Sequence, residues 1–427
     1  MKLKYKRTFL IGFAFLSISA FWQLYDSIIP LMLKNTFKQG ETLTGAIMAI
    51  DNILALFLLP FFGALSDKVD TPLGKRTPFI IIGTVFAVTF MMVIPHADKT
   101  VNFTLFIVSL GITLLAMGTY RSPAVALMPD LTPKPLRSKA NAVINLMGAV
   151  GYLIALAFIS LFVKKEANPD YTLVFGLVAS LMVVSVLILV MTIKEKKLAR
   201  QSVDENSPED EYGDLIEGEN KESLPKDVRK SLIFIFASIF LWFTAYNAVT
   251  TAYSRYAGEV WGLKGGSFAN SLMVAGAAAI VSYIPIGHIA SSIGRKRTIL
   301  MGILMMSFSY FCGFFFLRYS PWINLVFAIT GIGWSAINVN SYPMVVEMSR
   351  SGDIGKYTGY YYTFSMAAQI FTPIFSGFLL EKISYRTLFP YALVFSLLSF
   401  CTMLMVKHGD SRPPKKTSRL ESFDAMD

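Results

Sequence analysis

The chain reads Gly63-Ala-Leu-Ser-Asp67-Lys68 and, after five further residues, Gly74-Lys75-Arg76. A related stretch begins at Gly287 and reaches Gly294 and three basic residues. The glycines of the two copies are 224 and 220 residues apart. Each copy follows an apolar run and carries basic residues, as expected of a tight turn between two membrane helices. The repeat predicts that the chain is built from two homologous halves.

A second pair of positions repeats with a similar offset. Asp130 and Lys139 flank one short loop, and Glu347 and Lys356 flank another loop 217 residues further along. A carboxylate at a helix end can pair with a basic residue of a neighbouring helix. Each half is therefore expected to carry a releasable latch beside these turns.

The composition indicates a membrane protein. Of the 427 residues, 54% are hydrophobic and 16% are charged, and the mean hydropathy is +0.53. A soluble chain carries about 25% charged residues. These values exclude a secreted disulfide scaffold, a disordered chain and an ordinary cytosolic enzyme. The two cysteines, Cys312 and Cys401, lie in apolar runs and match no metal or redox motif.

Twelve apolar runs are long enough to cross a bilayer, which takes about 20 residues each. They predict an all-α integral membrane protein with twelve transmembrane helices in two pseudo-symmetric six-helix halves. The runs lie near residues 8–33, 43–65, 78–97, 103–128, 139–163, 171–193, 231–256, 267–291, 298–317, 322–346, 357–380 and 386–406.

The basic residues set the expected orientation. With both termini in the cytoplasm, the inner loops and termini hold 28 Lys and Arg, the outer loops hold 10, and Arg121 is placed inside a span. An inner excess of this kind is the rule for membrane proteins. It explains the net charge of +11 without a nucleic-acid partner. We expect a multi-pass protein of the cell membrane, monomeric, in contact with the lipid bilayer.

The expected domains follow from the span count. Residues 1–193 form the N-terminal half, 194–230 a charged cytoplasmic linker, 231–406 the C-terminal half and 407–427 a cytoplasmic tail. The linker holds 8 Lys and Arg and 11 Asp and Glu, which is typical of a solvated segment. A regulatory or docking role for the linker is the alternative.

The two copies of the glycine-rich turn resemble the corresponding loops of the major facilitator superfamily, over residues 8–406. The resemblance implies two rocking halves around a midplane site. It also implies a gating loop, whose candidate residues are Gly63, Asp67, Gly74, Lys75, Arg76 and Asp130. The second copy departs from the pattern, because Ser291 stands where the first has Asp67.

Two longer motifs carry a narrower resemblance. They are Gly74-Lys-Arg-Thr-Pro78-Phe-Ile and Arg121-Ser-Pro-Ala-Val-Ala-Leu-Met-Pro-Asp130. Together they look like the glycoside–pentoside–hexuronide:cation symporters, and most like the sucrose–proton carriers among them. The resemblance implies a sugar substrate and no cofactor, with a proton as the coupling ion and sodium as the alternative.

Three ionisable residues lie at membrane depth: Asp26, Asp51 and Arg121. Placing such a residue at the centre of a membrane helix costs about 2.5–3.5 kcal/mol on insertion scales, so each is expected to serve a function. Asp26 and Asp51 are candidates for proton coupling, although either could instead bind sugar hydroxyls or serve helix packing. The helical rise places both acids at similar depth and Arg121 roughly 13–16 Å further toward the inner side.

A set of amides and aromatics shares inward stripes with these charges. Sugars bind to such a mixture, because amides bond their hydroxyls and flat rings cover their apolar faces. The alternative is plain helix packing. The candidate substrate-binding residues are Trp22, Gln23, Asn52, Arg121, Asn145, Trp242, Tyr246, Asn247, Trp334, Asn338 and Gln369.

No motif supports catalysis. We find no phosphate-binding Gly-Lys-Ser/Thr loop, no His/Cys cluster for a metal and no Gly-x-Ser-x-Gly turn. The sequence therefore predicts a secondary transporter that takes up a glycoside or disaccharide, sucrose- or maltose-like, with protons by alternating access. The alternatives are an exporter of amphipathic or cationic molecules, a non-transporting sugar sensor, and a carrier of organic anions bound by Arg121.

Overall fold

The computed structural model describes residues 3–132, 136–166, 168–198, 225–348 and 354–410. Within these ranges, twelve helices are long and apolar enough to span a membrane, which confirms the expected number. The acidic part of the linker, residues 205–211, and the tail after residue 410 lie outside the described residues.

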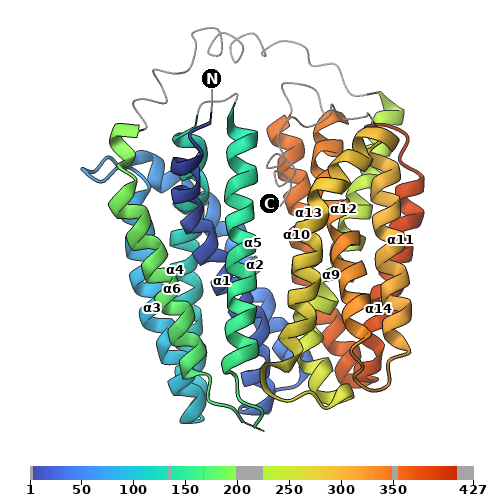
Figure 1. Cartoon of the computed structure of the whole chain (residues 1–427), viewed down its shortest axis with the longest axis horizontal. Helices are drawn as coiled ribbons and strands as arrows, with labels where there is room; N and C mark the ends of the chain where they lie inside the picture. Colours follow the sequence, from blue (N-terminus) through green and yellow to red (C-terminus); the bar gives the residue numbers. More distant parts are fainter. Residues whose placement is uncertain (1–2, 133–135, 167, 199–224, 349–353, 411–427) are drawn as a thin grey trace. The chain divides into compact units, whose positions relative to one another are not determined.

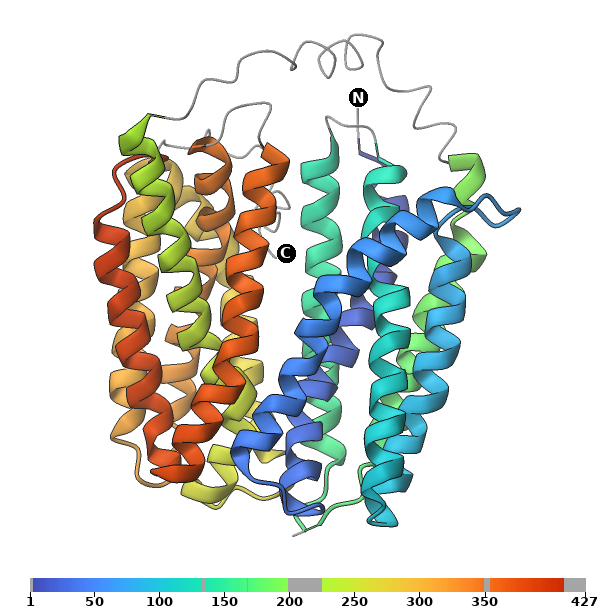
Figure 2. The same cartoon turned by 180° about the vertical axis from the view of Figure 1, so that it is seen from behind.

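The chain divides into two compact units. Unit 1 holds residues Met1–Asn206 and the segment Leu263–Met273, and unit 2 holds Ser207–Gly262 and Val274–Asp427. Figure 1 draws the helices of unit 1 in blue to green, and Figure 2 shows them from behind. The helices of unit 1 are α1 (Tyr5–Asn35), α2 (Glu41–Lys68), α3 (Thr77–Lys99), α4 (Phe103–Asp130), α5 (Arg137–Phe162) and α6 (Thr172–Thr192).

Unit 2 repeats this arrangement of six long helices. They are α9 (Lys226–Trp261), α10 (Ala269–Ile293), α11 (Arg295–Phe314), α12 (Ile323–Met348), α13 (Ile354–Lys382) and α14 (Leu388–Leu404). Two short 3-10 turns, η2 (Gly265–Phe268) and η4 (Tyr385–Thr387), precede α10 and α14.

The same helix pairs pack together in both units. In unit 1, α1 packs against α5 and α6, and α3 packs against α4 and α6; in unit 2, α9 packs against α13 and α14, and α11 against α12 and α14. The repeat in the sequence is therefore also present in the way the helices pack. The fold is thus two pseudo-symmetric six-helix halves.

The burial pattern is that of a membrane protein. Large apolar side chains remain exposed along the helices, among them Phe57, Phe61 and Val281. Helix α1 is instead mostly buried inside unit 1. Its close contact with α5 depends on Gly151, where a Cβ atom would lie 2.0 Å from the carbonyl oxygen of Leu16. Small residues allow this approach of two backbones in membrane helices.

Each unit has one end that carries the glycine-rich turn, which we call its basal end. In unit 1 it is the end at which α1 begins and α6 ends; in unit 2 it is the end at which α9 begins and α14 ends. The turn between α2 and α3 and the turn between α10 and α11 lie at these ends.

Candidate functional site

The three predicted intramembrane charges of unit 1 form one group. Asp26 on α1 and Asp51 on α2 are within electrostatic range of each other, and so are Asp51 and Arg121 on α4. Asn52 donates from Nδ2 to Oδ1 of Asp51 over 2.8 Å. We call Asp26, Asp51, Asn52 and Arg121 the acid–arginine group.

The guanidinium of Arg121 is held over an aromatic ring of α1. Its Cζ atom lies 5.7 Å from the centre of the Trp22 ring, a cation–π distance. Trp22 is one turn closer to the basal end than Asp26, and a long arginine side chain can reach it. The charged end of Arg121 therefore lies near the depth of the acids in the membrane. Its backbone, by contrast, is well away from them when residues are counted along the helices.

Two buried donors beside this group have no hydrogen-bond partner among the described residues. They are Nε1 of Trp22 and the hydroxyl of Tyr25, a residue that is only 2% exposed. Tyr25 is also within electrostatic range of Asp26 and Asp51. The sequence reasoning missed Tyr25, although its position next to Asp26 was a usable signal. Unpaired buried donors are costly, so these two atoms are available to a polar solute.

A hydrogen-bonded neighbour sets the position of Arg121. The hydroxyl of Tyr120 lies 2.6 Å from Oγ of Ser17 and donates to the carbonyl of Ala14 over 3.1 Å. These bonds tie α4 to α1 at the residue before Arg121. The stretch of α4 that carries Arg121 is thus tied to α1.

Two other candidates of unit 1 lie buried in the helix packing. Gln23 is 7% exposed and donates from Nε2 to Oγ of Ser27 in its own helix, over 2.6 Å. Asn145 on α5 is 4% exposed. The amide of Gln23 is thus engaged by a hydrogen bond within α1.

The aromatic candidates of unit 2 also come together. The rings of Tyr246 on α9 and Trp334 on α12 stack with centres 3.8 Å apart and planes 5° apart. Phe243 meets Trp334 edge-on at 5.2 Å. A hydrogen bond joins the side chains of Asn338 and Tyr283, which brings α12 and α10 together. We call Tyr246, Trp334, Asn338 and Tyr283 the aromatic group.

Unit 2 also holds buried donors without a partner among the described residues. Among them are Nε1 of Trp242, Nδ2 of Asn247 and the hydroxyl of Tyr310. Tyr310 is within electrostatic range of Tyr246 and, like Tyr283, was missed by the sequence reasoning. Gln369 donates weakly to the carbonyl of Ser365 in its own helix, at 3.4 Å.

A further buried arginine corrects the sequence analysis. Arg255 lies inside the predicted span 231–256, yet the charge count placed it with the outer residues; α9 continues to Trp261 and encloses it. It is 4% exposed, and its Nη1 donates to the carbonyl of Thr251 over 3.0 Å.

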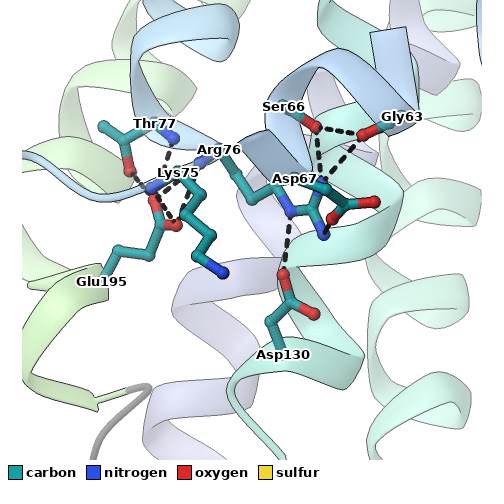
Figure 3. Close-up of polar contacts among 8 residues, drawn as sticks. All are labelled: Gly63, Ser66, Asp67, Lys75, Arg76, Thr77, Asp130 and Glu195. Carbon is teal, nitrogen blue, oxygen red and sulfur yellow. Dashed lines mark hydrogen bonds and ion pairs between the residues drawn. The ribbon is translucent and has the colours of Figure 1, made fainter. Parts of the chain in front are cut away.

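Figure 3 shows the predicted gating residues at the basal end of unit 1 apart from Gly74, together with the partners of Arg76. Its guanidinium donates from Nε to Oδ2 of Asp130 over 2.8 Å and from Nη2 to Oδ1 of Asp67 over 2.5 Å. Nη1 donates to Oγ of Ser66 over 2.5 Å and to the carbonyl of Gly63 over 3.3 Å. One side chain therefore joins the ends of α2, α3 and α4.

The charge of Arg76 is stabilised by these partners. Burial by itself lowers the pKa of a guanidinium, but the bonds from Asp130 and Asp67 outweigh burial and raise the pKa of Arg76. Arg76 is 6% exposed, so truncating it would leave both carboxylates without their buried counter-charge.

A residue that the sequence reasoning placed in the linker completes this cluster. Glu195 follows α6 and accepts hydrogen bonds from the backbone N–H groups of Lys75, Arg76 and Thr77 (Figure 3). Lys75 thus takes part in this cluster through its backbone N–H, which donates to Glu195, rather than through its ammonium group. The first N–H groups of a helix need outside acceptors, but nothing in the sequence says which residue supplies them. A Cβ at Gly74 would lie 2.3 Å from the Glu195 carboxyl carbon.

The second glycine-rich turn carries a simpler cluster. Arg295 pairs with Glu347 of α12, the counterpart of the Arg76–Asp130 pair. Ser291, at the position that corresponds to Asp67, donates to the carbonyl of Gly287 in its own helix. Unit 2 therefore has an ion pair at its turn, with Glu347 as the acid. No group of three metal-ligating side chains occurs in the described part of the chain.

Comparisons with known proteins agree with this fold. The model of the Major Facilitator Superfamily matches residues 11–349 and 272–424. The sucrose transport protein SUC3 of Arabidopsis thaliana is 29% identical over 156 residues, which cover 32% of this chain and 26% of that protein. The match therefore spans about a quarter of the curated relative.

Solved transporters share the architecture at low sequence identity. The nucleoside transporter NupG superposes with a TM-score of 0.67 and 15% identity, over 94% of this chain and 100% of that chain. The xylose transporter XylE of E. coli gives 0.65 and 14%, over 92% and 94% of the two chains. The matched family and these structures are transporters and not enzymes, as the sequence predicted.

Proposed function

Because the chain belongs to the major facilitator superfamily, we propose that it is a secondary active transporter that takes up a glycoside or disaccharide together with protons. Uptake proceeds by alternating access of the two halves. The observation that carries the proposal is the acid–arginine group, in which two carboxylates and one guanidinium share a partly buried site with Trp22.

The charges of this group favour a cycle with one proton. With Asp26 and Asp51 both ionised and Arg121 charged, the group has a formal charge of −1; with one proton bound it is neutral. A neutral group costs less to expose to a low-dielectric path than a charged one. The same balance disfavours an organic anion as substrate, because Arg121 is already offset by Asp51.

We propose that Asp26 is the proton carrier. Asp51 accepts a hydrogen bond from the amide of Asn52 and lies within electrostatic range of Arg121, and both contacts favour the carboxylate form of Asp51. Asp26 has the like charge of Asp51 as its neighbour, so a proton on Asp26 relieves the repulsion between the two acids.

The proposed substrate class rests on both units. The aromatic group offers flat rings and the amide of Asn338, and the unpartnered donors of Trp22 and Tyr25 suit sugar oxygens. The partial match to a sucrose transport protein supports the same class. The excess of basic residues at the basal ends supports a cell-membrane protein with those ends in the cytoplasm.

Counterflow in proteoliposomes tests the substrate class. Vesicles loaded with unlabelled sucrose, maltose or an aryl glucoside are diluted into the labelled sugar, with no pH gradient. Transient accumulation of label is expected for at least one sugar. Sugar binding without counterflow would indicate a sensor instead, and uptake of hydrophobic cations but no sugar would indicate an exporter.

A further inference from the structure

The two chain segments that leave the last helix of each half end in the same kind of contact. Glu195 comes three residues after α6 ends at Thr192, and Asp410 comes six residues after α14 ends at Leu404. Each carboxylate lies at the beginning of the third helix of its own half, α3 or α11.

In unit 1 the carboxylate of Glu195 is almost fully engaged. Oε1 accepts from the N–H of Lys75 at 2.7 Å and of Arg76 at 2.9 Å, and Oε2 accepts from the N–H of Thr77 at 2.9 Å and from its hydroxyl at 2.6 Å. Glu195 is 4% exposed. These are the N–H groups at the start of α3, where the helix dipole also favours an anion.

In unit 2 the corresponding carboxylate, Asp410, accepts fewer hydrogen bonds. Oδ1 of Asp410 accepts from the N–H of Lys296 over 2.8 Å. The ammonium of Lys296 donates back to the carbonyls of Leu404 and Val406, at 3.0 and 2.5 Å. Residue 296 therefore holds the segment after α14 from both its backbone and its side chain.

A glycine precedes the clamped residues in each half. Gly74 and Gly294 have φ angles of 114° and 95°, which favour glycine. A Cβ atom would lie 2.3 Å from the Glu195 carboxyl carbon at Gly74 and 2.7 Å from Oδ1 of Asp410 at Gly294. The two glycines are 220 residues apart and the two acids 215, so the repeat of the turns extends to the segments that close them.

We propose that Glu195 and Asp410 are matched carboxylate clamps that close the third helix of each half, and that Glu195 is a positioning residue for Arg76. The clamp acts on the backbone of Arg76 while the guanidinium of the same residue holds Asp67 and Asp130. The inference rests on the transporter family and not on the proposed sugar or coupling ion. It makes the start of the linker part of the gating cluster, rather than a passive tether.

Hydrogen exchange on the full-length protein in nanodiscs tests the clamps, with Glu195→Gln and Asp410→Asn as controls for each other. We expect exchange at amides 75–77 to rise about tenfold in Glu195→Gln. In Asp410→Asn, we expect a rise at amide 296. Each variant should leave the other turn unchanged. Wild-type exchange at amides 75–77 in Glu195→Gln, or equal loosening of both turns by either variant, would overturn the assignment.

A milder variant keeps the test decisive if Glu195→Gln does not fold. Thr77→Val removes one of the five hydrogen bonds to Glu195 and should raise exchange at the same amides by a smaller factor. Unchanged exchange in Thr77→Val would then count against the clamp.

A kinetic cycle tests positioning separately from stability. Counterflow rates are compared for wild type, Glu195→Gln, Arg76→Lys and the double variant, with whichever solute the protein carries. We expect Glu195→Gln to lower the maximal rate severalfold without changing the half-saturating concentration, and to have little further effect in Arg76→Lys. Multiplying effects would refute positioning through Arg76. If no sugar is carried, the exchange experiment still decides the clamp, and only the proposed substrate fails.

Discussion

The guanidinium of Arg121 lies over the indole of Trp22, with Cζ 5.7 Å from the ring centre. This contact joins α4 to α1 within electrostatic reach of Asp51. It places a fixed positive charge beside two acids, so the protonation of one acid decides whether the group is charged or neutral.

We expect Arg121→Lys to weaken substrate binding roughly tenfold in half-saturating concentration, because a partly desolvated cation–π contact is worth up to about 2 kcal/mol. Lysine retains the charge but lacks the flat guanidinium that covers the ring. Counterflow titrations measure the change. Arg318→Lys, at an exposed position, is the matched control, and an equal effect of both variants would refute a specific role for Arg121.

The stack of Tyr246 and Trp334 gives a second prediction. Trp334→Leu should raise the half-saturating sugar concentration about tenfold, since aromatic pairs add about 0.5–1.5 kcal/mol beyond the apolar area they bury. Trp334→Phe should restore part of the loss. Trp322→Leu, at a side chain that is 72% exposed, should leave the titration unchanged. Loss of sugar affinity in Trp322→Leu alone would contradict the assignment.

Gly74→Ala should destabilise the protein more than Gly262→Ala. Both positions have positive φ, 114° and 67°, but only at Gly74 would the added Cβ overlap a neighbour, the Glu195 carboxylate. The backbone term is about 1–3 kcal/mol at either site, and the overlap adds to it at Gly74 alone. Thermal unfolding in detergent compares the two, and equal melting temperatures would show that Glu195 does not occupy this space.

Arg76→Lys and Arg295→Lys should differ in severity. Arg76 bridges two acids through separate nitrogens, which a single ammonium cannot reproduce. Arg295 pairs with Glu347, a contact that lysine can replace in part. We expect a lower maximal transport rate in Arg76→Lys and a smaller loss in Arg295→Lys. The reverse order would indicate that the gating cluster of unit 2 dominates.

An ion pair at the opposite end of unit 1 predicts a pH dependence. Partial burial acts to raise the pKa of Asp170, but the hydrogen bonds from Lys99 and Thr172 and the charge of Lys99 outweigh it and hold the pKa at about 2. The folded pKa lies below the unfolded value of about 3.9. Asp170 therefore contributes stability above that value and loses the contribution as the pH falls toward 2.

The melting temperatures of wild type and Asp170→Asn should accordingly differ slightly at pH 6, and the difference should shrink as the pH falls from about 4 toward 2. The difference is small because both partners are about half exposed. Glu166→Gln, in the same loop, is the control. A gap between wild type and Asp170→Asn that widens on acidification would contradict the assigned pKa.

The sequence predicted most of the architecture because hydropathy and the repeated turns are local signals. Twelve spans and the two halves could be inferred in this way, and Asp67, Arg76 and Asp130 could be named as gating candidates, although not which of them bond to one another. Glu195 could not, because its partners lie about 120 residues away and an acid in a charged linker has no distinguishing neighbours. Tyr283 and Tyr310 were missed for a related reason: a tyrosine in an apolar run looks the same whether it packs or binds.

The end of α9 shows a second limit of hydropathy, which is that it does not locate helix ends. Its last turns hold Arg255 and Glu259, so hydropathy falls while the helix continues. The predicted span therefore ended near residue 256, whereas the helix continues to Trp261. Hydropathy locates the centre of a membrane helix better than its ends.

The most direct test of the account is sugar uptake driven by an imposed proton gradient in proteoliposomes, with wild type and Asp26→Asn compared at equal protein density. Wild type should accumulate the sugar above its external concentration. Asp26→Asn should abolish that accumulation while retaining counterflow without a gradient. Accumulation at the wild-type level by Asp26→Asn would contradict the assignment of Asp26 as the proton carrier, and if Asp51→Asn also accumulated sugar, proton coupling by this group would be wrong.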